Sequence, residues 1–365
     1  MNILFIANHL NVGGISSYLF TLSSGLKNKG HNVYLASSGG DGMDKFRKAG
    51  IAHIWVPLRT KNEISVKIIL SFFKLSAQLK KLNIDLLHSN SRTTQVLGNL
   101  LSRYQGVPHI FTCHGFFKPK LSRRLFPCWG EGVIAISQQV KEHLIFDFKL
   151  SELKINVINN GIDTGNFGDF SAREKMRKAL GVNDSPLVGI IARLSDVKGH
   201  SYLIQAMQTV IKSFSSAKLL IVGEGKMKPA LVKEVNDLGI KDNVLFLAEA
   251  ENTKDVLAAM DIFVMPSLQE GLGLALMEAM AQGLAVVGSA VGGIKSLIQD
   301  KVNGLLVEPA DQAGLAGVII KLLGDSLMRR DLGEQARKFI MHNFSKEKMV
   351  KETEGVYKQC LKEKA

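Results

Sequence analysis

Short runs of apolar residues alternate with longer amphipathic segments along the first 165 positions of the chain. Apolar runs of this length are typical of strands in a buried parallel sheet, and the longer segments have helical spacing. The expected strands cover residues 2–7, 32–36, 52–56, 85–88, 109–112, 133–136 and 155–158. The expected helices lie near residues 15–28, 42–49, 63–82, 91–103 and 137–148. This alternation predicts an α/β fold with helices on both faces of a parallel sheet.

The alternation stops between about residues 160 and 186, and then it resumes. The later expected strands lie near residues 187–192, 218–222, 244–247, 261–265, 284–287 and 304–307, and two helices follow near 325–342 and 345–363. We therefore expect two Rossmann-like, doubly wound domains, 1–165 and 166–345, with a C-terminal helix at 346–365 that packs back on the first domain. Because such sheets bind ligands at the carboxyl ends of their strands, we expect the two domains to face a central cleft that holds the site.

The stretch from Asp261 to Gly288 joins a strand, a glycine-rich corner at Glu270 to Gly273, and an apolar helix that carries Glu278. An ionised carboxylate in such a helix needs a partner, unless it tips out into solvent at the helix edge. In a continuous helix Glu270 and Glu278 would be ~12 Å apart along the axis, whereas the two carboxylates of a glycoside hydrolase lie roughly 5–9.5 Å apart. We therefore expect the two carboxylates to have separate roles, although the glycine corner could fold Glu270 back over the start of the helix. The backbone N–H groups of the corner suit a phosphate group.

Two other glycine-containing junctions follow expected strands. Gly13-Gly14 precedes the first helix, where the backbone could approach an anion closely or could simply turn. Gly223-Glu224-Gly225 resembles the start of a dinucleotide fingerprint, but the third glycine is replaced by Lys228, so an oxidoreductase is a poor interpretation.

Charged and titratable side chains also lie at strand ends. Arg193 and Lys198 follow one strand and could clamp a diphosphate, or both could be solvated loop charges. His114 follows the strand at 109–112, where it could contact a substrate or have a structural role. The cysteines at positions 113, 128 and 360 have no metal-binding or redox spacing, so we expect reduced, structural thiols.

The composition, 46% hydrophobic and 22% charged, is that of a soluble globular protein, and we expect a cytoplasmic location. The net charge of +13 lies mainly in residues 1–165, which hold 20 Lys and Arg against 9 Asp and Glu. Within them, an amphipathic helix is expected near 63–82, with Ile64 on its apolar face and Ser71 on its polar face. This helix and the basic, aromatic segment 116–129 could contact an anionic bilayer on the inner membrane face, or could be a core-packing helix and a solvated loop. No nucleic-acid motif accompanies the charge.

Together these motifs resemble the retaining glycosyltransferase family 4, which has the GT-B fold. Glu270 and Glu278 match its E-x7-E element, and the similarity covers essentially the whole chain. Four further motifs follow in the family order: Gly13-Gly14, Asn160-Gly161-Ile162-Asp163, the Arg193 and Lys198 pair, and Gly223-Glu224-Gly225. The chain departs from the family at Leu272 and Ala285, where Phe and Pro are common, but neither position supplies a catalytic group.

The resemblance implies that the second domain binds a nucleotide-sugar donor and the first domain an acceptor. Glu278 would bind the donor ribose, and Arg193 with Lys198 would neutralise the diphosphate. Glu270 and the backbone of Gly271, Leu272 and Gly273 would hold the transferred sugar. Glu224 and the loop after Phe246 would flank the base, and Gly223 would belong to the same donor site. His114 would lie beside the reacting carbon, and Gly13-Gly14 would complete the donor site, with Gly14 in contact with a phosphate.

The expected activity is therefore that of a metal-independent hexosyltransferase without a cofactor. It would transfer a sugar, from a UDP-sugar rather than a GDP-sugar, to a glycan or lipid-linked acceptor of a bacterial surface polysaccharide such as lipopolysaccharide. Two alternatives remain open. One is an epimerase of nucleotide sugars with the same fold, and the other is a weakly catalytic subunit that binds nucleotide beside a second enzyme.

Overall fold

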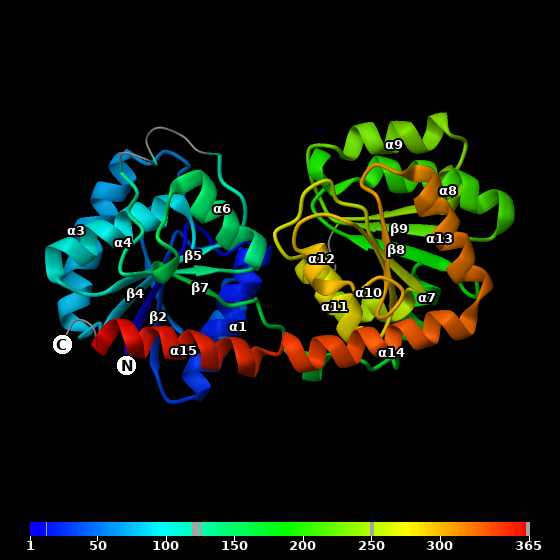
Figure 1. The fold of residues 1–365 in the computed structure, drawn as a ribbon. Coiled ribbons are helices and arrows are strands. Elements are labelled where there is room, and N and C mark those ends of the chain that lie inside the picture. Colours follow the sequence, from blue (N-terminus) through cyan, green and yellow to red (C-terminus); the bar gives the residue numbers. More distant parts are fainter. Residues whose placement is uncertain (12, 119–122, 124–125, 249–251, 363–365) are drawn as a thin grey trace. The chain divides into compact units, whose positions relative to one another are not determined.

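The computed structural model describes residues 1–11, 13–118, 123, 126–248 and 252–362 (Figure 1). The chain divides into two compact units. The N-terminal unit contains Met1–Gly161 and Lys346–Ala365, and the C-terminal unit contains Ile162–Ser345. The change of unit lies close to the expected domain boundary, and the last helix belongs to the N-terminal unit.

In the described part of the N-terminal unit, a parallel sheet has the strand order β3-β2-β1-β4-β5-β6-β7. Its strands are β1 (Asn2–Ile6), β2 (Asn32–Ser37), β3 (Ala52–Trp55), β4 (Leu86–Ser89), β5 (His109–Cys113), β6 (Gly132–Ala135) and β7 (Ile155–Val157). The accompanying helices are α1 (Gly14–Asn28), α2 (Met43–Lys48), α3 (Val66–Lys81), α4 (Arg92–Gln105), α6 (Gln138–Phe148) and α15 (Lys346–Lys362). Every strand and helix predicted for this half is confirmed.

Alternate residues of β1 build two apolar cores on opposite faces of this sheet. Ile3 and Phe5 pack with buried residues of α1 and α15, whereas Leu4 and Ile6 pack with those of α3 and α4. Both faces are therefore covered, which is why the strands are continuous apolar runs rather than alternating ones.

The C-terminal unit has a second parallel sheet, with the described strand order β10-β9-β8-β11-β12-β13. Its strands are β8 (Leu187–Ile191), β9 (Lys218–Val222), β10 (Val244–Leu247), β11 (Ile262–Met265), β12 (Ala285–Ser289) and β13 (Leu305–Val307). Its helices are α7 (Arg173–Ala179), α8 (His200–Ser213), α9 (Lys228–Asp237), α10 (Thr253–Ala259), α11 (Leu274–Gln282), α12 (Ile294–Leu297), α13 (Gln312–Gly324) and α14 (Ser326–Asn343). Helix α11 packs against β11, β12, α10 and α14, so its apolar sequence reflects burial between layers.

Both sheets reverse their strand order at one point, between β1 and β4 and between β8 and β11. Ligands of doubly wound sheets bind beside such a switch point, at the carboxyl ends of the strands. In the C-terminal unit the two adjoining loops are those that carry Arg193, Lys198 and Glu270.

Helix α3 differs from the amphipathic helix that was predicted. Ser71, expected on its polar face, is buried, and its hydroxyl donates to the backbone carbonyl of Lys67 at 2.6 Å. Ile64, expected on the apolar face, lies before the helix and is exposed. The helix has a buried apolar face with Ile68, Leu75 and Leu79, and a second apolar face that points outward. No helix in the described chain is long and apolar enough to cross a membrane.

Candidate active site

Lys198 and Glu270 form an ion pair at the switch point of the C-terminal sheet. The ammonium nitrogen of Lys198 lies 2.5 Å from Oε2 of Glu270. Both side chains are largely shielded from solvent, at 20% and 12% exposure. The pair joins the loop after β8 to the loop after β11, so the two motifs meet although they are far apart in the sequence.

The glycine corner after Glu270 presents backbone donors at the start of α11. The other carboxylate oxygen of Glu270 accepts a hydrogen bond from the Gly271 N–H at 3.2 Å. Among the residues that the structure describes, no acceptor is bonded to the N–H groups of Leu272, Gly273 or Leu274. These donors lie at the positive end of a helix dipole, which favours a bound anion.

Glu278 lies on the least buried stripe of α11, together with Leu274 and Ala275. The side chain is half-buried and takes part in an interaction within the protein. The opposite side of the helix, with Leu276, Met277 and Met280, is fully buried. Glu278 is therefore neither enclosed in the core nor fully solvated.

Glycines allow the loops at this edge of the sheet to approach each other closely. A Cβ atom at Gly223 would lie 2.2 Å from the carbonyl oxygen of Ala192, and one at Gly225 would lie 2.1 Å from that of Leu194. Both contacts are shorter than van der Waals distance, so no larger residue fits. The glycines after β9 thus support the loop that carries Arg193 and Lys198.

The same kind of contact occurs at Gly292-Gly293, which the sequence interpretation did not select. A Cβ atom at Gly292 would lie 2.2 Å from the carbonyl oxygen of Glu270, and one at Gly293 would lie 2.2 Å from that of Gly271. The Gly293 N–H also donates to the Glu270 carbonyl at 3.0 Å. A pair of glycines in the loop that follows a strand was the available signal, as it was for Gly13-Gly14.

Arg193 and Glu224 lie at the outside of this group of loops. Arg193 is exposed, and no hydrogen bond or ion pair joins it to a described residue. Glu224 is 56% exposed and pairs with Lys228 at 2.8 Å on the first turn of α9. Arg193 is therefore available to an anionic ligand, whereas Glu224 is engaged at the surface. The loop after Phe246, also expected to flank the base, lies partly outside the residues that the structure describes, at 249–251.

Gly13 and Gly14 are exposed at the start of α1, beside the switch point of the N-terminal sheet. Gly13 has φ 156°, and nothing lies within 4 Å of a Cβ atom placed there. Asn8 fixes the preceding loop, because its Oδ1 accepts from the hydroxyls of Ser91 (2.8 Å) and Thr93 (2.7 Å). In contrast to Gly225, Gly13 has open space in front of it.

His114 is half-buried at the carboxyl end of β5. Its Nε2 lies 3.1 Å from Oδ1 of Asn90. An amide oxygen can only accept, so Nε2 carries the hydrogen and Nδ1 has the unshared electron pair. The Tyr18 ring meets the imidazole edge-on at 4.6 Å between centroids. Burial lowers the pKa of His114 to about 3, so the ring is neutral at physiological pH.

The basic, aromatic segment at 116–129 lies partly outside the described residues, including Lys120 and Arg124. Arg123 lies with its guanidinium over the Phe117 ring at 4.7 Å and pairs with Glu63 at 3.7 Å. The Arg123 side chain is therefore held within the protein. This position fits neither a bilayer-facing nor a solvated side chain, the two alternatives for this segment.

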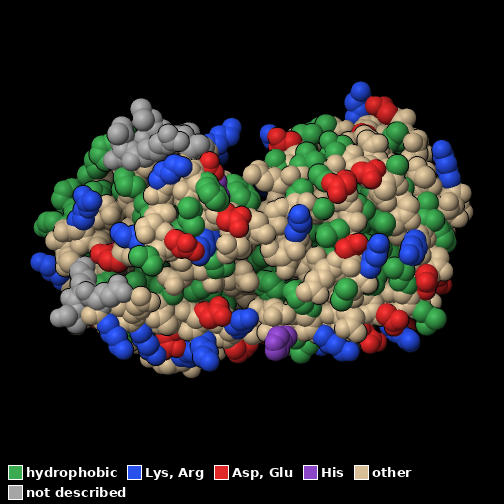
Figure 2. Space-filling view, viewed as in Figure 1, with side chains coloured by type: hydrophobic (Ala, Val, Ile, Leu, Met, Phe, Trp, Pro, Cys, Tyr) green, Lys and Arg blue, Asp and Glu red, His purple; other side chains and the backbone are tan. Residues whose placement is uncertain are grey.

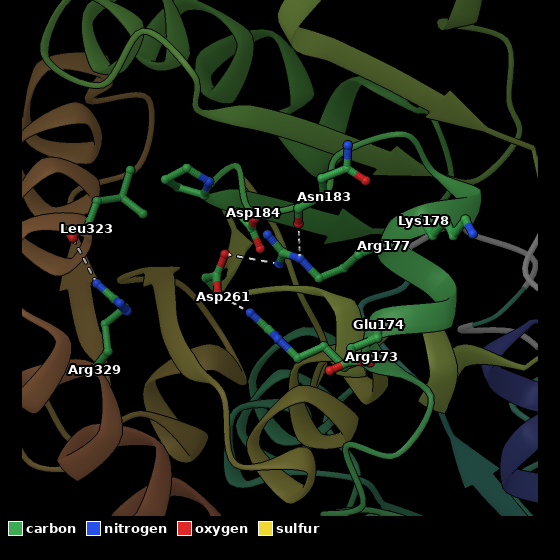
Figure 3. A pocket seen from close by; sticks show the side chains of 10 residues that line it. Arg173, Glu174, Arg177, Lys178, Asn183, Asp184, Asp261, Leu323 and Arg329 are labelled. Atoms are coloured by element: carbon green, nitrogen blue, oxygen red, sulfur yellow. Dashed lines mark hydrogen bonds and ion pairs between the residues drawn. The ribbon is translucent and has the colours of Figure 1, made fainter.

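The C-terminal unit also has a cavity of about 760 Å³ at the opposite, amino edge of its sheet (Figure 3). Arg173 and Arg177 of α7 point toward Asp261 there, and each donates to its carboxylate. Both guanidinium groups also donate to backbone carbonyls, including those of Ala258 and Ala259. These bonds fasten α7 to the sheet, so we interpret the cluster as structural.

No three His, Cys, Asp or Glu side chains converge as a metal site among the described residues. Cys113 and Cys360 are buried, Cys128 is partly exposed, and no disulfide joins them in the described chain. Burial raises the pKa of the Cys113 thiol to about 12, which makes it unreactive.

Comparisons with known proteins agree with this architecture. Residues 12–166 match the family model described as Glycosyltransferase Family 4, and residues 172–339 match the one described as Glycosyl transferases group 1. An uncharacterized glycosyltransferase of Methanocaldococcus jannaschii is 28% identical, with coverage of 96% of this chain and 95% of the relative.

The UDP-Gal:alpha-D-GlcNAc-diphosphoundecaprenol alpha-1,3-galactosyltransferase of Escherichia coli is 26% identical, with coverage of 91% of this chain and 90% of the relative. Among solved structures, Anabaena HepE in complex with UDP and glucose has a TM-score of 0.88 at 22% identity, and the match covers 98% of this chain and 99% of that one. This likeness confirms the predicted pair of Rossmann-like α/β domains.

Proposed function

The chain belongs to the glycosyltransferases that these two family models describe, and on this basis we propose that it transfers a sugar from a UDP-sugar to a hydroxyl group of a glycan or lipid-linked acceptor. The acceptor would be a precursor of cell-surface polysaccharide. The name of the E. coli relative, which specifies UDP-galactose and a diphosphoundecaprenol-linked acceptor, supports this assignment, as does the UDP bound to HepE.

The observation that carries the proposal is the convergence of Lys198, Glu270 and the start of α11 at one switch point. Lys198 and Arg193 bind the diphosphate. Lys198 supplies a point charge, and Arg193 supplies a planar guanidinium that is exposed and forms no bond to a described residue. Glu270 and the N–H groups of Leu272 and Gly273 bind the transferred sugar and the adjoining phosphate.

Glu278 and the loop after β9 bind the nucleoside. Glu278, on the least buried stripe of α11, accepts hydrogen bonds from the ribose hydroxyls. Gly223 supports the loop, and Glu224 lies beside the base. In the N-terminal unit, the exposed Gly13-Gly14 turn contacts a phosphate, because open space and backbone donors at a helix start suit an anion.

The reaction breaks the bond between the anomeric carbon and the oxygen of the β-phosphate. The acceptor oxygen forms its bond to this carbon on the same face, so the anomeric configuration is retained, and its proton passes to the leaving diphosphate. Arg193 and Lys198 stabilise the charge that develops on the diphosphate, a role that a divalent cation has in other enzymes.

His114 contacts a substrate hydroxyl at the carboxyl edge of the N-terminal sheet. Its neutral ring, protonated at Nε2 by the bond to Asn90, accepts a hydrogen bond at Nδ1. A histidine with a pKa of about 3 is a weak base, so it orients the hydroxyl and stabilises positive charge at the reacting carbon without removing a proton.

The outward apolar face of α3 holds the enzyme on an anionic bilayer, on the inner membrane face where a lipid-linked acceptor would be found. We define the α3 surface as Val66, Ile69, Leu70 and Phe73, which are 54–67% exposed. Hydrophobic side chains gather at this edge of the N-terminal unit (Figure 2). Exposed lysines at 67, 74, 80 and 81 flank the surface. Apolar side chains bordered by lysines suit the headgroup boundary of such a bilayer.

A donor panel tests the transferase assignment. The purified chain, an acceptor mixture and UDP- or GDP-sugars should release nucleoside diphosphate, with and without EDTA, and the product should keep the anomeric configuration of the donor. Lys198→Ala should lower turnover at least about 100-fold, in the range of a lost charged contact in the transition state. Glu278→Ala should lower kcat/KM for the donor at least about 10-fold, because it removes the charged acceptor of the ribose hydroxyls. Lys233→Ala, on the exposed side of α9, is the matched control.

Three outcomes would overturn parts of the proposal. Normal turnover in both site variants would remove the donor-site assignment. Isomerisation of the donor without an acceptor would indicate an epimerase. Turnover that requires a co-purifying protein would indicate a nucleotide-binding subunit of a larger enzyme.

A further inference from the structure

Four polar side chains lie together inside the apolar core of the N-terminal unit. Tyr18 comes from α1, His88 from β4, Thr112 from β5 and Tyr357 from α15, and none is more than 2% exposed. Replacing such a set with apolar groups of the same shape is often neutral for stability. Stability alone therefore does not explain why the core contains them.

The four groups form an unbroken chain of hydrogen bonds. The Tyr357 hydroxyl lies 2.5 Å from Nδ1 of His88, Nε2 of His88 lies 2.7 Å from the Thr112 hydroxyl, and that hydroxyl lies 3.1 Å from the Tyr18 hydroxyl. Burial raises the pKa of Tyr18 well above its ordinary value and lowers that of His88 well below its ordinary value, so all four groups are neutral.

Neutral His88 has one N–H group, so one ring nitrogen donates and the other accepts. If Tyr357 donates to Nδ1, then Nε2 must donate to Thr112, and Thr112 can pass its own hydrogen to Tyr18. In the reverse order, Nδ1 of His88 donates to Tyr357, Thr112 donates to Nε2, and the Thr112 hydroxyl can then only accept from Tyr18. A change at Tyr357 therefore affects the bond that Tyr18 makes at the other end.

The chain ends against His114. The ring whose hydroxyl is held by Thr112 is the same ring that meets the His114 imidazole edge-on, at 4.6 Å and 76°. Asn90 holds the imidazole from another direction, at Nε2. These two contacts together fix the plane of the ring and the direction in which Nδ1 points.

Helix α15 brings Tyr357 into this core from the last segment of the chain, and it lies alongside α1, the helix that carries Tyr18 (Figure 1). Glu354 pairs with Lys29 at 2.7 Å. Gly25 of α1 permits close packing, since a Cβ atom there would lie 2.4 Å from a methyl group of Val350. Tyr357 and Tyr18 are thus held in register by two further contacts.

We propose that Tyr357, His88 and Thr112 are positioning residues, which hold the Tyr18 ring and thereby orient His114 toward the substrate. This inference rests on the proposed function only in that His114 contacts a substrate. The orientation of the ring itself is a property of the N-terminal unit. It can be measured without turnover.

The experiment compares Thr112→Val, which removes the hydroxyl shared by His88 and Tyr18, with Thr112→Ser, which keeps it. Thr112→Val should lower kcat about 10-fold with the donor KM within twofold, and Thr112→Ser should stay within twofold of the native kcat. Tyr357→Phe, far from the substrate, should lower kcat about threefold. Val356→Ala is the control, because it removes core packing from α15 and leaves the hydrogen bonds intact.

Nitrogen-15 spectra of the histidine rings give the second measurement, with His114→Gln to assign the signals. The His114 signals should shift in Thr112→Val and Tyr357→Phe and remain in place in Thr112→Ser and Val356→Ala. Unchanged His114 signals in folded Thr112→Val protein would overturn the inference, as would an equal loss of kcat in the Ser and Val variants. If His114→Gln keeps full activity while the signals still shift, then the role of His114 in the proposed function fails and the positioning chain stands.

Discussion

The Lys198 ammonium group and the Glu270 carboxylate lie 2.5 Å apart, although 72 positions separate the two residues. This ion pair joins the loop after β8 to the loop after β11. A buried charge that loses its partner is strongly destabilised. A donor that binds Lys198 through its diphosphate and Glu270 through its sugar would supply new partners to both groups at once.

We predict that Glu270→Gln separates nucleotide binding from turnover. The amide keeps the size of the side chain but no longer neutralises Lys198, which becomes fully available to the diphosphate. UDP should therefore bind at least as tightly as to the native protein, whereas turnover of the UDP-sugar should fall about 100-fold, as for one lost charged contact in the transition state. Titration calorimetry with UDP and a turnover assay measure the two effects.

Lys198→Met provides the matched comparison for this prediction, because it removes the other member of the same pair. It should weaken UDP binding at least about 10-fold, which corresponds to 1.4 kcal/mol. If Glu270→Gln weakened UDP as much as Lys198→Met does, the two residues would act as one unit on the nucleotide, and the separate assignments would be wrong.

Most of the fold was predictable because each strand is covered on both faces. Residues 3–6 of β1, for example, are all buried, so the apolar run is unbroken and extends to Ala7, one position beyond the strand. The second apolar face of α3 was not predicted, because helical spacing accounts for one apolar stripe and places the remaining positions on the polar side. Ser71 satisfies its hydroxyl on the helix backbone and can be buried, which reverses the polarity expected at that position.

The members of the candidate site were also predictable, but their relations to one another were not. Spacing along the chain says nothing about the contact between Lys198 and Glu270, because the switch point brings the two loops together in space. The resemblance places Gly223 in the donor site, whereas in the structure both Gly223 and Gly225 fit closely against carbonyl oxygens of the neighbouring loop. A glycine that faces a ligand and one that faces a backbone are identical in the sequence.

Gly225→Ala distinguishes these two roles of glycine. Its φ is not in the left-handed region, so the effect is steric: the new Cβ would lie 2.1 Å from the carbonyl oxygen of Leu194. We expect the loop to shift, with a fall in stability of about 1–3 kcal/mol and at least tenfold weaker UDP binding, measured by thermal unfolding and calorimetry. Gly317→Ala in α13 has open space and should be neutral or stabilising by about 1 kcal/mol. A purely ligand-facing role for Gly225 would leave the unfolding temperature unchanged.

Buried histidines predict a loss of stability in mild acid. Burial lowers the pKa of His109, in the N-terminal unit, and of His200, in the C-terminal unit, to about 4. Between pH 6.5 and 4 the unfolded chain therefore binds more protons at these residues than the folded chain, and the free energy of unfolding falls as the pH falls. The expected loss is roughly 2 kcal/mol for each residue at pH 5, and stability is regained above the unfolded pKa.

Scanning calorimetry at pH 5, 6 and 7 checks this prediction. Both units should unfold at lower temperature at pH 5. His200→Asn should flatten the pH dependence in the C-terminal unit, whereas the exposed His342→Asn in the same unit should leave it unchanged. Equal pH slopes in the native protein and His200→Asn would show that other groups control the acid transition.

We predict that the α3 surface binds an anionic bilayer. This binding should require both the apolar side chains of the surface and the lysines that flank it. Lys74 lies over the exposed Trp55 ring at 5.0 Å, so a cation and an aromatic ring suited to the headgroup region adjoin the surface. The native chain should sediment with vesicles that contain phosphatidylglycerol, more weakly at high salt, and should not sediment with phosphatidylcholine alone.

The double variant Leu70→Ser with Phe73→Ser should lower the vesicle partition coefficient at least about 30-fold, because burying each native side chain contributes about 1.5–3 kcal/mol. Both residues are more than half exposed, so the variant should unfold at the native temperature. Leu327→Ser, at a 63% exposed apolar position on α14 in the other unit, is the control and should bind as the native chain does. Full binding by the double variant would show that the lysines act without the apolar face, and equal binding to both lipids would show that the charge has no part in it.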